Sequence, residues 1–349
     1  MTIPDKHTVF RVTARNSPKD VKAFEEAVPA IDDHEVLVQI KATSLNFRDI
    51  AIANGMYPFP VAKNVVPVSD AAGIVVKVGA KVDGFREGDR VVAAFDPTLL
   101  YGPAKDWDHA HGGPVDGMLR QYAPFTPSAL IKVAESSELS FPELAALVCT
   151  GTTAWNALFG NLPIKPGQTV LFQGTGGVSI TGLIIARALG ARTIITSSSD
   201  DKLAEVKRKY GADFTINYKK TPDWASEALK LTGGEGVDYI LENGGSGTIA
   251  QSIKATRWGG QVAVIGFLSQ AKQEDMPDVA SLALSRAVIV RGIVVGSKQL
   301  LEELLTFVGV KNLKPPVEKV FKFSQEDVVA AYEYMASGSH MGKVAISLE

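Results

Sequence analysis

A glycine-rich turn at residues 174–179 carries the clearest chemical signal in the sequence. It reads GTGGVS, follows the apolar run TVLFQ at 169–173 and precedes a helix-forming segment. In such a unit the first glycine allows a tight turn, the second lets the backbone approach a pyrophosphate, and a small third residue permits close helix–strand packing. The helix N-terminus then offers free N–H groups to the phosphates. The turn predicts a dinucleotide site that includes Gly174, Gly176, Gly177, Val178 and Ser179.

The end of the next predicted strand, Arg192–Ser197, selects between the two nicotinamide dinucleotides. NAD sites place an acid about 20 residues past the glycines, where it holds the ribose 2′-hydroxyl. Residue 197, twenty positions after Gly177, is a serine. The hydroxyls of Ser197 and Ser198, with the nearby Lys202, suit a 2′-phosphate that a carboxylate would repel. We therefore predict NADP(H) as the cofactor.

Three further residues bear on this choice of cofactor. Asp200 and Asp201 could supply the missing acid, but negative charge is favoured in the first turn of a helix, so we expect them to begin the next one. Tyr218 ends the third predicted strand and could lie against the adenosine phosphate end of the cofactor.

The glycine turn belongs to a long region in which strands and helices alternate. Ser140-Phe-Pro-Glu combines a serine cap, an early proline and an early acid, which predict a helix start. Strands are predicted at Thr169–Gln173, Arg192–Ser197, Phe214–Tyr218, Val237–Glu242, Gln261–Phe267 and Val288–Val295. Helices between them are predicted to end at Leu189 and to span Lys202–Tyr210, Asp223–Leu231, Gly247–Arg257 and Val279–Ser285. This alternation predicts a Rossmann-type, doubly wound parallel sheet over residues 134–296.

The first third of the chain is β-rich instead. Short alternating or β-branched runs at Glu35–Leu45, Ala72–Val78 and Arg90–Phe95, separated by glycines, are typical of a small barrel or sandwich. The C-terminal part does not extend the α/β repeat: it predicts helices at Lys298–Val308 and Gln325–Ala336 and strands at Glu318–Phe323 and Lys343–Leu348. We assign residues 1–133 and 297–349 to one discontinuous domain.

Composition restricts the possible partners. The chain has 349 residues and a net charge of −2, so it lacks the basic field that attracts nucleic acid or an anionic membrane. No run is long and apolar enough to span a bilayer, and the start has no hydrophobic run typical of a secretory signal. The single cysteine, Cys149, suits a reducing compartment. We expect a cytoplasmic protein with a small-molecule substrate and no nucleic-acid or membrane partner.

Several ordered motifs resemble those of the medium-chain dehydrogenase/reductase family. Besides the glycine turn, they read SLNFRD at 44–49, PVSDAAG at 67–73, GFREGDRV at 84–91, CTGTTAW at 149–155 and GK at 342–343. The resemblance covers nearly the whole chain. It implies a GroES-like, β-rich substrate domain and a Rossmann cofactor domain, with the active site in the cleft between them.

Zinc alcohol dehydrogenases of this family take a Cys, a His and a Cys from three of these motifs. The matching residues here are Asn46, Ser69 and Cys149, and only the last is a metal-binding side chain. A catalytic zinc needs about three protein ligands and an open position. The only histidine pair, His109 and His111, lies in a Gly/Asp-rich loop without an evident third ligand, and we interpret both as solvent-exposed. We predict no metal site.

The pattern NFRD, with Tyr57 in GMYP, instead resembles the zinc-independent quinone oxidoreductases and enoyl reductases. There the motif asparagine lies by the nicotinamide, which implies a catalytic role for Asn46. Tyr57 is a candidate proton donor or a packing residue, and Asp49 either orients its neighbours or is simply an acid at a helix start. We expect Arg48 to be a surface or salt-bridge residue.

The remaining cofactor contacts follow from the resemblance and from strand ends. Thr153 matches a family threonine that meets the nicotinamide amide, and the loop Pro97–Gly117, with Tyr101 and Trp107, could shape the substrate pocket or be a surface excursion. The predicted cofactor-binding set is completed by Thr153, Asn243, Gly266, Phe267, Leu268, Ser297 and Lys343.

Three functions remain open. The leading hypothesis is an NADPH-dependent, zinc-independent reductase of activated double bonds or quinones, because conjugated acceptors spread the incoming charge without a metal. The alternatives are a zinc-free alcohol dehydrogenase acting on carbonyls and an NADPH-binding protein with little catalysis, such as a sensor or partner subunit.

We also predict a homodimer. The β-branched strand Val288–Val295 would end the sheet, and a bare edge of this kind is prone to aggregate unless it pairs with its copy across a two-fold axis.

Overall fold

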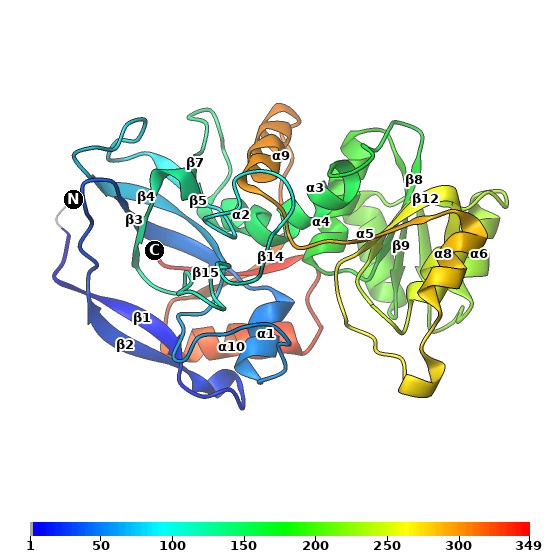
Figure 1. Ribbon diagram of the computed structural model, residues 1–349, viewed down its shortest axis with the longest axis horizontal. Helices are drawn as coiled ribbons and strands as arrows, with labels where there is room; N and C mark the ends of the chain where they lie inside the picture. Colours follow the sequence, from blue (N-terminus) through cyan, green and yellow to red (C-terminus); the bar gives the residue numbers. More distant parts are fainter. Residues whose placement is uncertain (1–2) are drawn as a thin grey trace. The chain divides into compact units, whose positions relative to one another are not determined.

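The computed structural model describes residues 3–349, which form two compact units (Figure 1). The first unit contains the residues up to Thr152 together with Val295–Glu349, and the second contains Thr153–Val294. The sequence placed the first boundary earlier, after residue 133. The boundary lies later because α2 (Phe141–Ala146) packs on β3 (Val36–Ser44), β4 (Asp70–Val78) and β15 (Lys343–Ser347) of the first unit.

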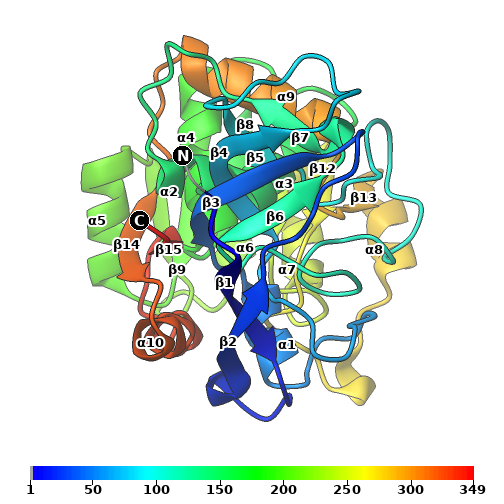
Figure 2. The ribbon, with the colours of Figure 1, turned by 90° about the vertical axis from the view of Figure 1, so that its left-hand side faces the viewer.

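The first unit is built mainly of antiparallel strands (Figure 2). Its sheet has the order β14-β15-β3-β4-β5-β7, with β6 also paired to β3, while β1 and β2 form a separate ribbon. Its other strands are β1 (Lys6–Val12), β2 (Val21–Ala27), β5 (Arg90–Ala93), β6 (Tyr122–Phe125), β7 (Leu130–Lys132) and β14 (Val317–Lys322). Its other helices are α1 (Phe47–Ala53), α9 (Lys298–Val310) and α10 (Gln325–Ala336).

The C-terminal segment is part of the first unit because it completes that unit's sheet and core. Strand β15 pairs antiparallel with β3, so that Ala345 lies opposite Ser44. Helix α10 contributes Val328 and the fully buried Tyr332 to an apolar cluster that also contains Phe10 of β1 and Ile52 of α1. The predicted discontinuous domain is therefore held together by pairing between strands about three hundred residues apart in sequence.

The second unit has a parallel sheet of order β10-β9-β8-β11-β12-β13, the arrangement of a doubly wound dinucleotide-binding fold. The Rossmann prediction is confirmed. The strands are β8 (Thr169–Gln173), β9 (Arg192–Ser197), β10 (Phe214–Asn217), β11 (Val237–Glu242), β12 (Thr256–Val264) and β13 (Ile289–Gly292). The helices are α3 (Thr152–Phe159), α4 (Gly177–Ala188), α5 (Asp200–Tyr210), α6 (Trp224–Leu231), α7 (Ile249–Ala255) and α8 (Val279–Arg286).

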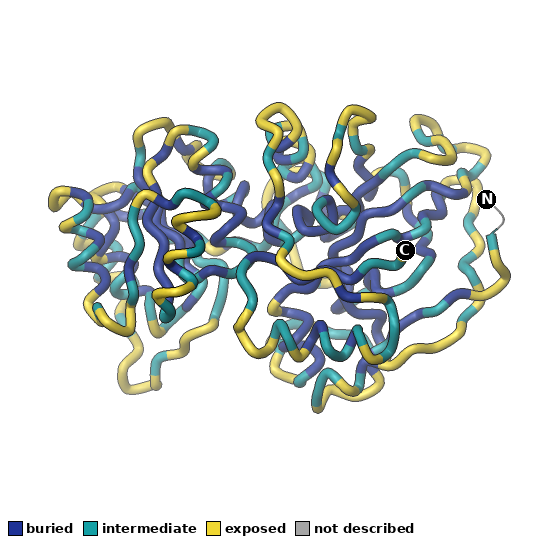
Figure 3. Tube along the Cα trace, turned by 180° about the vertical axis from the view of Figure 1, so that it is seen from behind, coloured by how far each residue is buried: buried dark blue, intermediate teal, exposed yellow. Residues whose placement is uncertain are grey.

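Side-chain alternation along the central strands explains why helices cover both faces of this sheet. Leu171 and Ile240 belong to the apolar cluster that contains α6, whereas their neighbours Phe172 and Leu241 face Gly182 of α4. The central strands are therefore buried on both faces, as the dark tube of Figure 3 shows.

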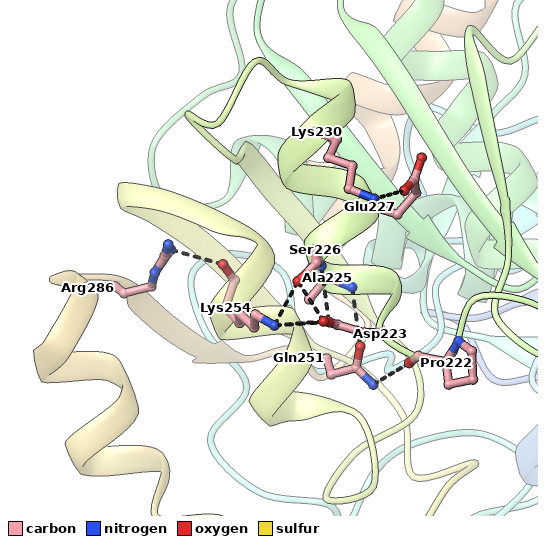
Figure 4. Close-up of polar contacts among 9 residues, drawn as sticks. All are labelled: Pro222, Asp223, Ala225, Ser226, Glu227, Lys230, Gln251, Lys254 and Arg286. Carbon is pink, nitrogen blue, oxygen red and sulfur yellow. Dashed lines mark hydrogen bonds and ion pairs between the residues drawn. The ribbon is translucent and has the colours of Figure 1, made fainter.

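The side of the sheet that carries α6, α7 and α8 is tied together by polar contacts (Figure 4). Asp223 caps α6 by accepting hydrogen bonds from the backbone and hydroxyl of Ser226, and Lys254 of α7 donates to the same carboxylate at 3.0 Å. Arg286, the last residue of α8, donates to the Lys254 carbonyl oxygen at 2.9 Å and so satisfies the C-terminal end of α7. These residues are fully engaged in joining the three helices.

One element boundary in the second unit differs clearly from the prediction. Strand β12 begins at Thr256, within the segment that the sequence assigned to a helix ending at Arg257. The early part of β12 pairs with Val237 of β11 through a register shift, so tertiary pairing overrides the local helical pattern. No helix among residues 3–349 is long and apolar enough to cross a membrane.

Candidate functional site

The glycine turn lies between β8 and α4, as predicted, and leaves open space in front of the helix. Gly174 has φ +75°, a left-handed conformation that favours glycine. Gly176 is the N-cap of α4, and Gly177 is its first residue. A Cβ on Gly176 would meet no atom within 4 Å, and its φ of −78° suits any residue, so packing does not require a glycine there. The open space beside free helix N–H groups fits a pyrophosphate.

The closest helix–strand approach is made at Gly182, a residue that the sequence reasoning did not single out. A Cβ there would lie 2.7 Å from Phe172 Cε1 and 3.1 Å from Leu241 Cδ2. Ser179 is buried, and its hydroxyl donates to the Gln173 carbonyl oxygen at 2.7 Å. Ser179 therefore joins the helix to the strand through a hydrogen bond. The contact that requires a glycine is made one helical turn later, at Gly182.

Glu242, also missed from the sequence, organises the turn that follows β11. This fully buried carboxylate accepts hydrogen bonds from the backbone of Gly244 at 2.7 Å and of Gly245 at 2.9 Å, and from Gln173 Nε2 at 2.7 Å. Thr248 and Ser252 donate their hydroxyls to the same group. The signal was an acid placed directly after the apolar residues YIL of the run VDYILE, because buried charge requires several partners.

The predicted cofactor residues at the ends of β11 and β12 lie together at the carboxyl edge of the sheet. Asn243 donates its amide to the Gln173 carbonyl oxygen and to Ser179 Oγ, both at 3.0 Å, so this group positions the turn. A Cβ on Gly266 would lie 2.6 Å from the Asn243 carbonyl oxygen, which also accepts the Leu268 N–H at 3.2 Å. Phe267 is half-buried and Leu268 is exposed. Ligands of doubly wound sheets bind at this edge.

The ends of β9 and β10 bring together the residues predicted to recognise the 2′-phosphate. Ser197 is buried, and its hydroxyl accepts the N–H of Ser199 at 3.2 Å, so it shapes the turn. Ser198 and Lys202 are half-buried, and Tyr218 is 42% exposed directly beyond β10. The Tyr218 N–H donates to the Ser197 carbonyl oxygen at 3.1 Å, which places the two predicted residues side by side.

Asp200 begins α5, as expected, and its carboxylate already has partners. It accepts a hydrogen bond from Asn217 Nδ2 at 2.7 Å and forms an ion pair with Lys220. Hydrogen bonds from Lys220 and Asn217 lower the pKa of this carboxyl.

In the first unit, a buried polar cluster forms where β3, β4 and β15 meet. Lys343 Nζ donates to Asn46 Oδ1 at 2.7 Å, to the Leu45 carbonyl oxygen at 2.8 Å and to Asp70 Oδ2 at 3.1 Å. Asp70 also accepts from Ser44 Oγ at 2.9 Å and from Ser69 Oγ at 2.8 Å. Strand register explains the meeting, because Ser44 lies opposite both Asp70 of β4 and Ala345 of β15.

The backbone is strained immediately before this cluster. Val68 has φ +73°, which is unfavourable for a β-branched residue. It is held there by Met118 N–H, which donates to its carbonyl oxygen at 2.7 Å, and by the close backbone of Gly112 and Gly117. Such strain concentrates at functional sites, and here it directs Ser69 and Asp70 inward.

Three residues predicted to bind the cofactor, Lys343, Ser297 and Thr153, are buried within their own units. All three N–H donors of Lys343 are used by protein acceptors, and the residue is 1% exposed, so its ammonium is not free for a cofactor. Ser297 is buried and caps α9 by accepting the Leu300 N–H. Thr153 is buried in α3. The side chains of Lys343 and Ser297 make structural hydrogen bonds, and the cofactor contacts expected of the three residues stay predictions.

Asp49 is the buried acid of α1. Its Oδ2 accepts the Asn46 N–H at 2.7 Å, which confirms the helix-start interpretation, while Oδ1 is buried without a hydrogen-bond partner among residues 3–349. Burial raises the pKa of Asp49 to about 6, against the opposing charge of Arg48. The N-cap Asn46 and Asp49 are thus fixed to one another at the start of α1.

Two predictions about loop and surface residues are wrong. Arg48 is only 9% exposed and forms no salt bridge among residues 3–349; its Nη1 donates to the His111 carbonyl oxygen at 2.7 Å. His111 is buried too, and burial lowers its pKa to about 4, so its ring is neutral at pH 7. The loop that carries His111 folds back onto α1, whereas His109 is exposed as expected.

Tyr57 is the first of three aromatic side chains that contact one another in succession. Its ring meets Phe59 edge-on with centroids 5.3 Å apart, and Phe59 stacks on Trp107 at 3.9 Å. Trp107 belongs to the long loop that the sequence linked to a substrate pocket. Burial raises the pKa of Tyr57, so the residue is a neutral phenol at pH 7. We refer to Tyr57, Phe59 and Trp107 as the aromatic cluster.

Comparisons with known proteins agree with these folds. The sequence matches the profile of the alcohol dehydrogenase GroES-like domain over residues 32–135 and that of the zinc-binding dehydrogenase domain over residues 177–309. A zinc-type alcohol dehydrogenase-like protein of Schizosaccharomyces pombe is 44% identical over 335 residues, which cover 94% of this chain and 95% of the relative.

Solved structures are similar over the whole chain. An NAD-dependent alcohol dehydrogenase has a TM-score of 0.85 and 30% identity, covering 98% of this chain and 100% of that one. A quinone oxidoreductase of Pseudomonas syringae pv. Tomato has a TM-score of 0.81 and 25% identity, covering 98% and 100%.

The donor atoms at the family's zinc positions do not fit a zinc ion. Asn46 Oδ1 is 2.7 Å from the Lys343 ammonium, so a second cation there would be repelled. Ser69 offers a hydroxyl that is bound to Asp70. Cys149 is the one metal-binding side chain of the three, whereas a catalytic zinc needs about three protein ligands.

Gly176 and Gly182 form a matched pair for testing the glycine turn. Gly176→Ala should weaken dinucleotide binding about tenfold, the loss of about 1.4 kcal/mol of phosphate contact, without changing stability. Gly182→Ala should lower the free energy of unfolding by about 1–3 kcal/mol, because its methyl overlaps Phe172. Calorimetric titration and denaturant unfolding measure the two effects. Equal loss of stability in both variants would contradict the open space at Gly176.

Asp49→Asn should change how stability depends on pH. The folded-state pKa is raised from 3.8 to about 6, so the stabilising contribution of the protonated acid is present below about pH 4 and is lost as pH rises through about 6. Asparagine keeps an acceptor for the Asn46 N–H but carries no charge. The stability of the variant relative to the native chain should rise by about 3 kcal/mol across this window in urea unfolding. A difference that stays flat with pH would refute the raised pKa.

Proposed function

The chain belongs to the medium-chain dehydrogenase/reductase superfamily of oxidoreductases, within which we propose that it is an NADPH-dependent, zinc-independent reductase of activated double bonds or quinones. The observation that carries this proposal is the Lys343 ammonium on Asn46 and Asp70. A fixed positive charge stands where zinc enzymes of the family gather ligands. An acceptor that spreads its own incoming charge needs no Lewis acid, whereas a simple ketone does.

The choice of NADPH over NADH rests on the ends of β9 and β10. The position that would hold an acid in an NAD site is the buried Ser197, and the carboxylate of Asp200, three residues later, is engaged by Lys220 and Asn217. Ser198, Lys202 and Tyr218 lie at this edge, where a 2′-phosphate would bind. Asn217 and Lys220 keep the carboxylate paired and its negative charge partly neutralised.

The residues of the first unit have distinct roles in the proposed reaction. Bound NADPH supplies a hydride to the electrophilic carbon of the conjugated acceptor. The side-chain amide of Asn46 is oriented by Lys343, which donates to its Oδ1, and by Ser69, which accepts from its Nδ2 at 3.4 Å. The second N–H of this amide can donate to the acceptor or to the nicotinamide. Tyr57 supplies the proton from its phenol, because its raised pKa keeps it protonated at pH 7. The aromatic cluster offers flat surfaces for a planar substrate.

An acceptor panel tests this function. NADPH oxidation is followed with an enone, a quinone, a simple ketone and no acceptor, and NADH is run in parallel. We expect turnover with the enone or the quinone, preference for NADPH, and about 100-fold slower enone reduction by Tyr57→Phe. Turnover of the ketone alone would support a carbonyl reductase, and no turnover of any acceptor a binding protein. Activity that requires stoichiometric zinc would refute zinc independence.

We also propose that two copies of the chain associate through the β13 edge. Strand β13 ends the parallel sheet, and the neighbouring α8 has no buried residue. Leu284 of α8 is 83% exposed and Met276 just before it is 49% exposed. An open strand edge beside exposed apolar side chains favours a self-complementary interface.

Light scattering coupled to size exclusion tests this association. The native chain should have the mass of a dimer, and Leu284→Asp should shift it towards the monomer, because the charge would be buried in the interface. A charge at the exposed Val310, 78% exposed on α9, is the control and should leave the dimer intact. A monomeric native chain would remove the proposal.

A further inference from the structure

Arg48 is a buried cation with unused hydrogen-bonding capacity. Its Nη1 donates to the His111 carbonyl oxygen, but Nε and Nη2 are buried without a hydrogen-bond partner among residues 3–349. No carboxylate in that range lies within salt-bridge distance of it. An uncompensated buried guanidinium is costly, so a protein that keeps one gains from it elsewhere.

The guanidinium of Arg48 lies over two aromatic rings. The Cζ atom lies 4.8 Å from the centroid of Phe95 and 5.5 Å from that of Tyr57. Both distances are within the range of cation–π attraction. Tyr57 is also a member of the aromatic cluster. Arg48 therefore links α1 to Tyr57, the proposed proton donor.

We propose that Arg48 is the positioning residue for Tyr57, and that its guanidinium is the counter-charge for the tyrosinate formed when Tyr57 gives up its proton. This inference rests on the proposed function, in which Tyr57 is the donor. Hydride from NADPH forms the new C–H bond at the electrophilic carbon, and the π electrons of the double bond move to the neighbouring carbon and its carbonyl. The Tyr57 O–H bond then breaks, and its proton forms the second C–H bond. NADPH is oxidised to NADP⁺, and water reprotonates the tyrosinate.

The Nε and Nη2 groups of Arg48, which have no hydrogen-bond partner among residues 3–349, suit the change of Tyr57 from a neutral phenol to an anionic phenolate. With a neutral phenol the guanidinium has no ion-pair partner among residues 3–349, whereas a phenolate would supply one, so this stabilisation appears only as the proton departs. Interactions stronger in the transition state than in the ground state are those that accelerate a reaction. The guanidinium is already held in place by the His111 carbonyl oxygen and by its contacts with the two rings.

Gly113 leaves room for this arrangement. A Cβ on Gly113 would lie 2.6 Å from Arg48 Nη2, so any side chain there would displace the guanidinium. Gly113 does not have a left-handed backbone conformation, so alanine is compatible with its φ. The glycine is therefore explained by the position of Arg48.

The charged and titratable groups near Tyr57 shift its pKa in different directions. Arg48 lowers the pKa of Tyr57, and Cys149 and Asp49 raise it, while burial is the largest influence and raises it as well. His111 is neutral at pH 7, because its own pKa is lowered to about 4. Arg48 is thus the cation that favours ionisation of Tyr57.

The test compares the pH dependence of four variants. Arg48→Met removes the charge at similar length, Arg48→Lys keeps the charge, and Tyr57→Phe removes the donor. Arg90→Lys is the control, because Arg90 also donates to carbonyl oxygens, of Ser137 and Leu139, and lies over a ring, that of Phe141 at 5.1 Å. All variants are first checked for thermal unfolding.

We expect Arg48→Met to lower kcat about 10- to 100-fold at pH 7 and to move the alkaline limb of the pH profile up by about one pH unit. The sign follows because loss of the cation raises the Tyr57 pKa further. Arg48→Lys should restore part of the rate, and Arg90→Lys should leave the limb in place. In the Tyr57→Phe background, Arg48→Met should change kcat less than about twofold. The proposal is overturned if the alkaline limb of the pH profile does not move in Arg48→Met. It is also overturned if Arg48→Met lowers kcat equally in the native and Tyr57→Phe backgrounds.

A second measurement does not depend on activity. The ultraviolet difference spectrum between each chain and its Tyr57→Phe counterpart reports ionisation of Tyr57 without cofactor or substrate. Its midpoint should rise by about one pH unit in Arg48→Met. If the acceptor panel fails but this midpoint shifts, the proposed function is wrong and the Arg48–Tyr57 coupling stands. If turnover is present but the midpoint does not move, the coupling is wrong.

Gly113→Ala keeps the test decisive if Arg48→Met does not fold. Its added methyl displaces the guanidinium while keeping every charge. The tyrosinate midpoint should move upward in this variant too, by less than in Arg48→Met. A stable Gly113→Ala chain with the native midpoint would contradict the proposal.

Discussion

The buried contact between Lys343 and Asp70 is the interaction on which the first unit depends. The two side chains are 1% and 0% exposed, and the ammonium also reaches Asn46 and the Leu45 carbonyl oxygen. Removing one partner of such a pair leaves an uncompensated charge, at a cost of about 3–5 kcal/mol. Because Lys343 begins β15 and Asp70 begins β4, the pair joins the C-terminal strand to the N-terminal sheet. It also fixes the amide of Asn46, so stability and the candidate chemistry share one contact.

The other buried charges of this unit are less well compensated, and they lie on α1. Arg48 has no carboxylate partner among residues 3–349, and Asp49 has an oxygen without a hydrogen bond in the same range. A helix of seven residues that places a cation and an anion inside the fold is poorly explained by stability alone. The polar interior of α1 is better explained by function, because the neighbouring Gly112 and Gly113 lie against the strained Val68 and against Arg48, whose guanidinium lies over the Tyr57 ring.

The second unit shows a different balance. Its buried carboxylate, Glu242, is fully supplied with donors from two glycine N–H groups, Gln173 and two hydroxyls. The turn after β11 is thus held by many hydrogen bonds, while the space at Gly174 and Gly176 stays open. In the proposed function, the second unit presents an open cradle for phosphates, and the first unit presents groups whose charge can change.

From local period and spacing, the sequence by itself determined that a parallel, doubly wound sheet carries the glycine cradle. The replacement of metal ligands by Asn46 and Ser69 came from the resemblance of the motifs to those of zinc alcohol dehydrogenases. The sequence also predicted that Asp200 begins a helix, and a helix start was one of two interpretations of Asp49. Only the tertiary structure decided that Lys343 is directed inward, that Arg48 and His111 are buried, and that Gly182 makes the closest approach. Each of these depends on a partner far away in sequence, and burial of a long polar side chain is decided by that partner and not by its neighbours along the chain.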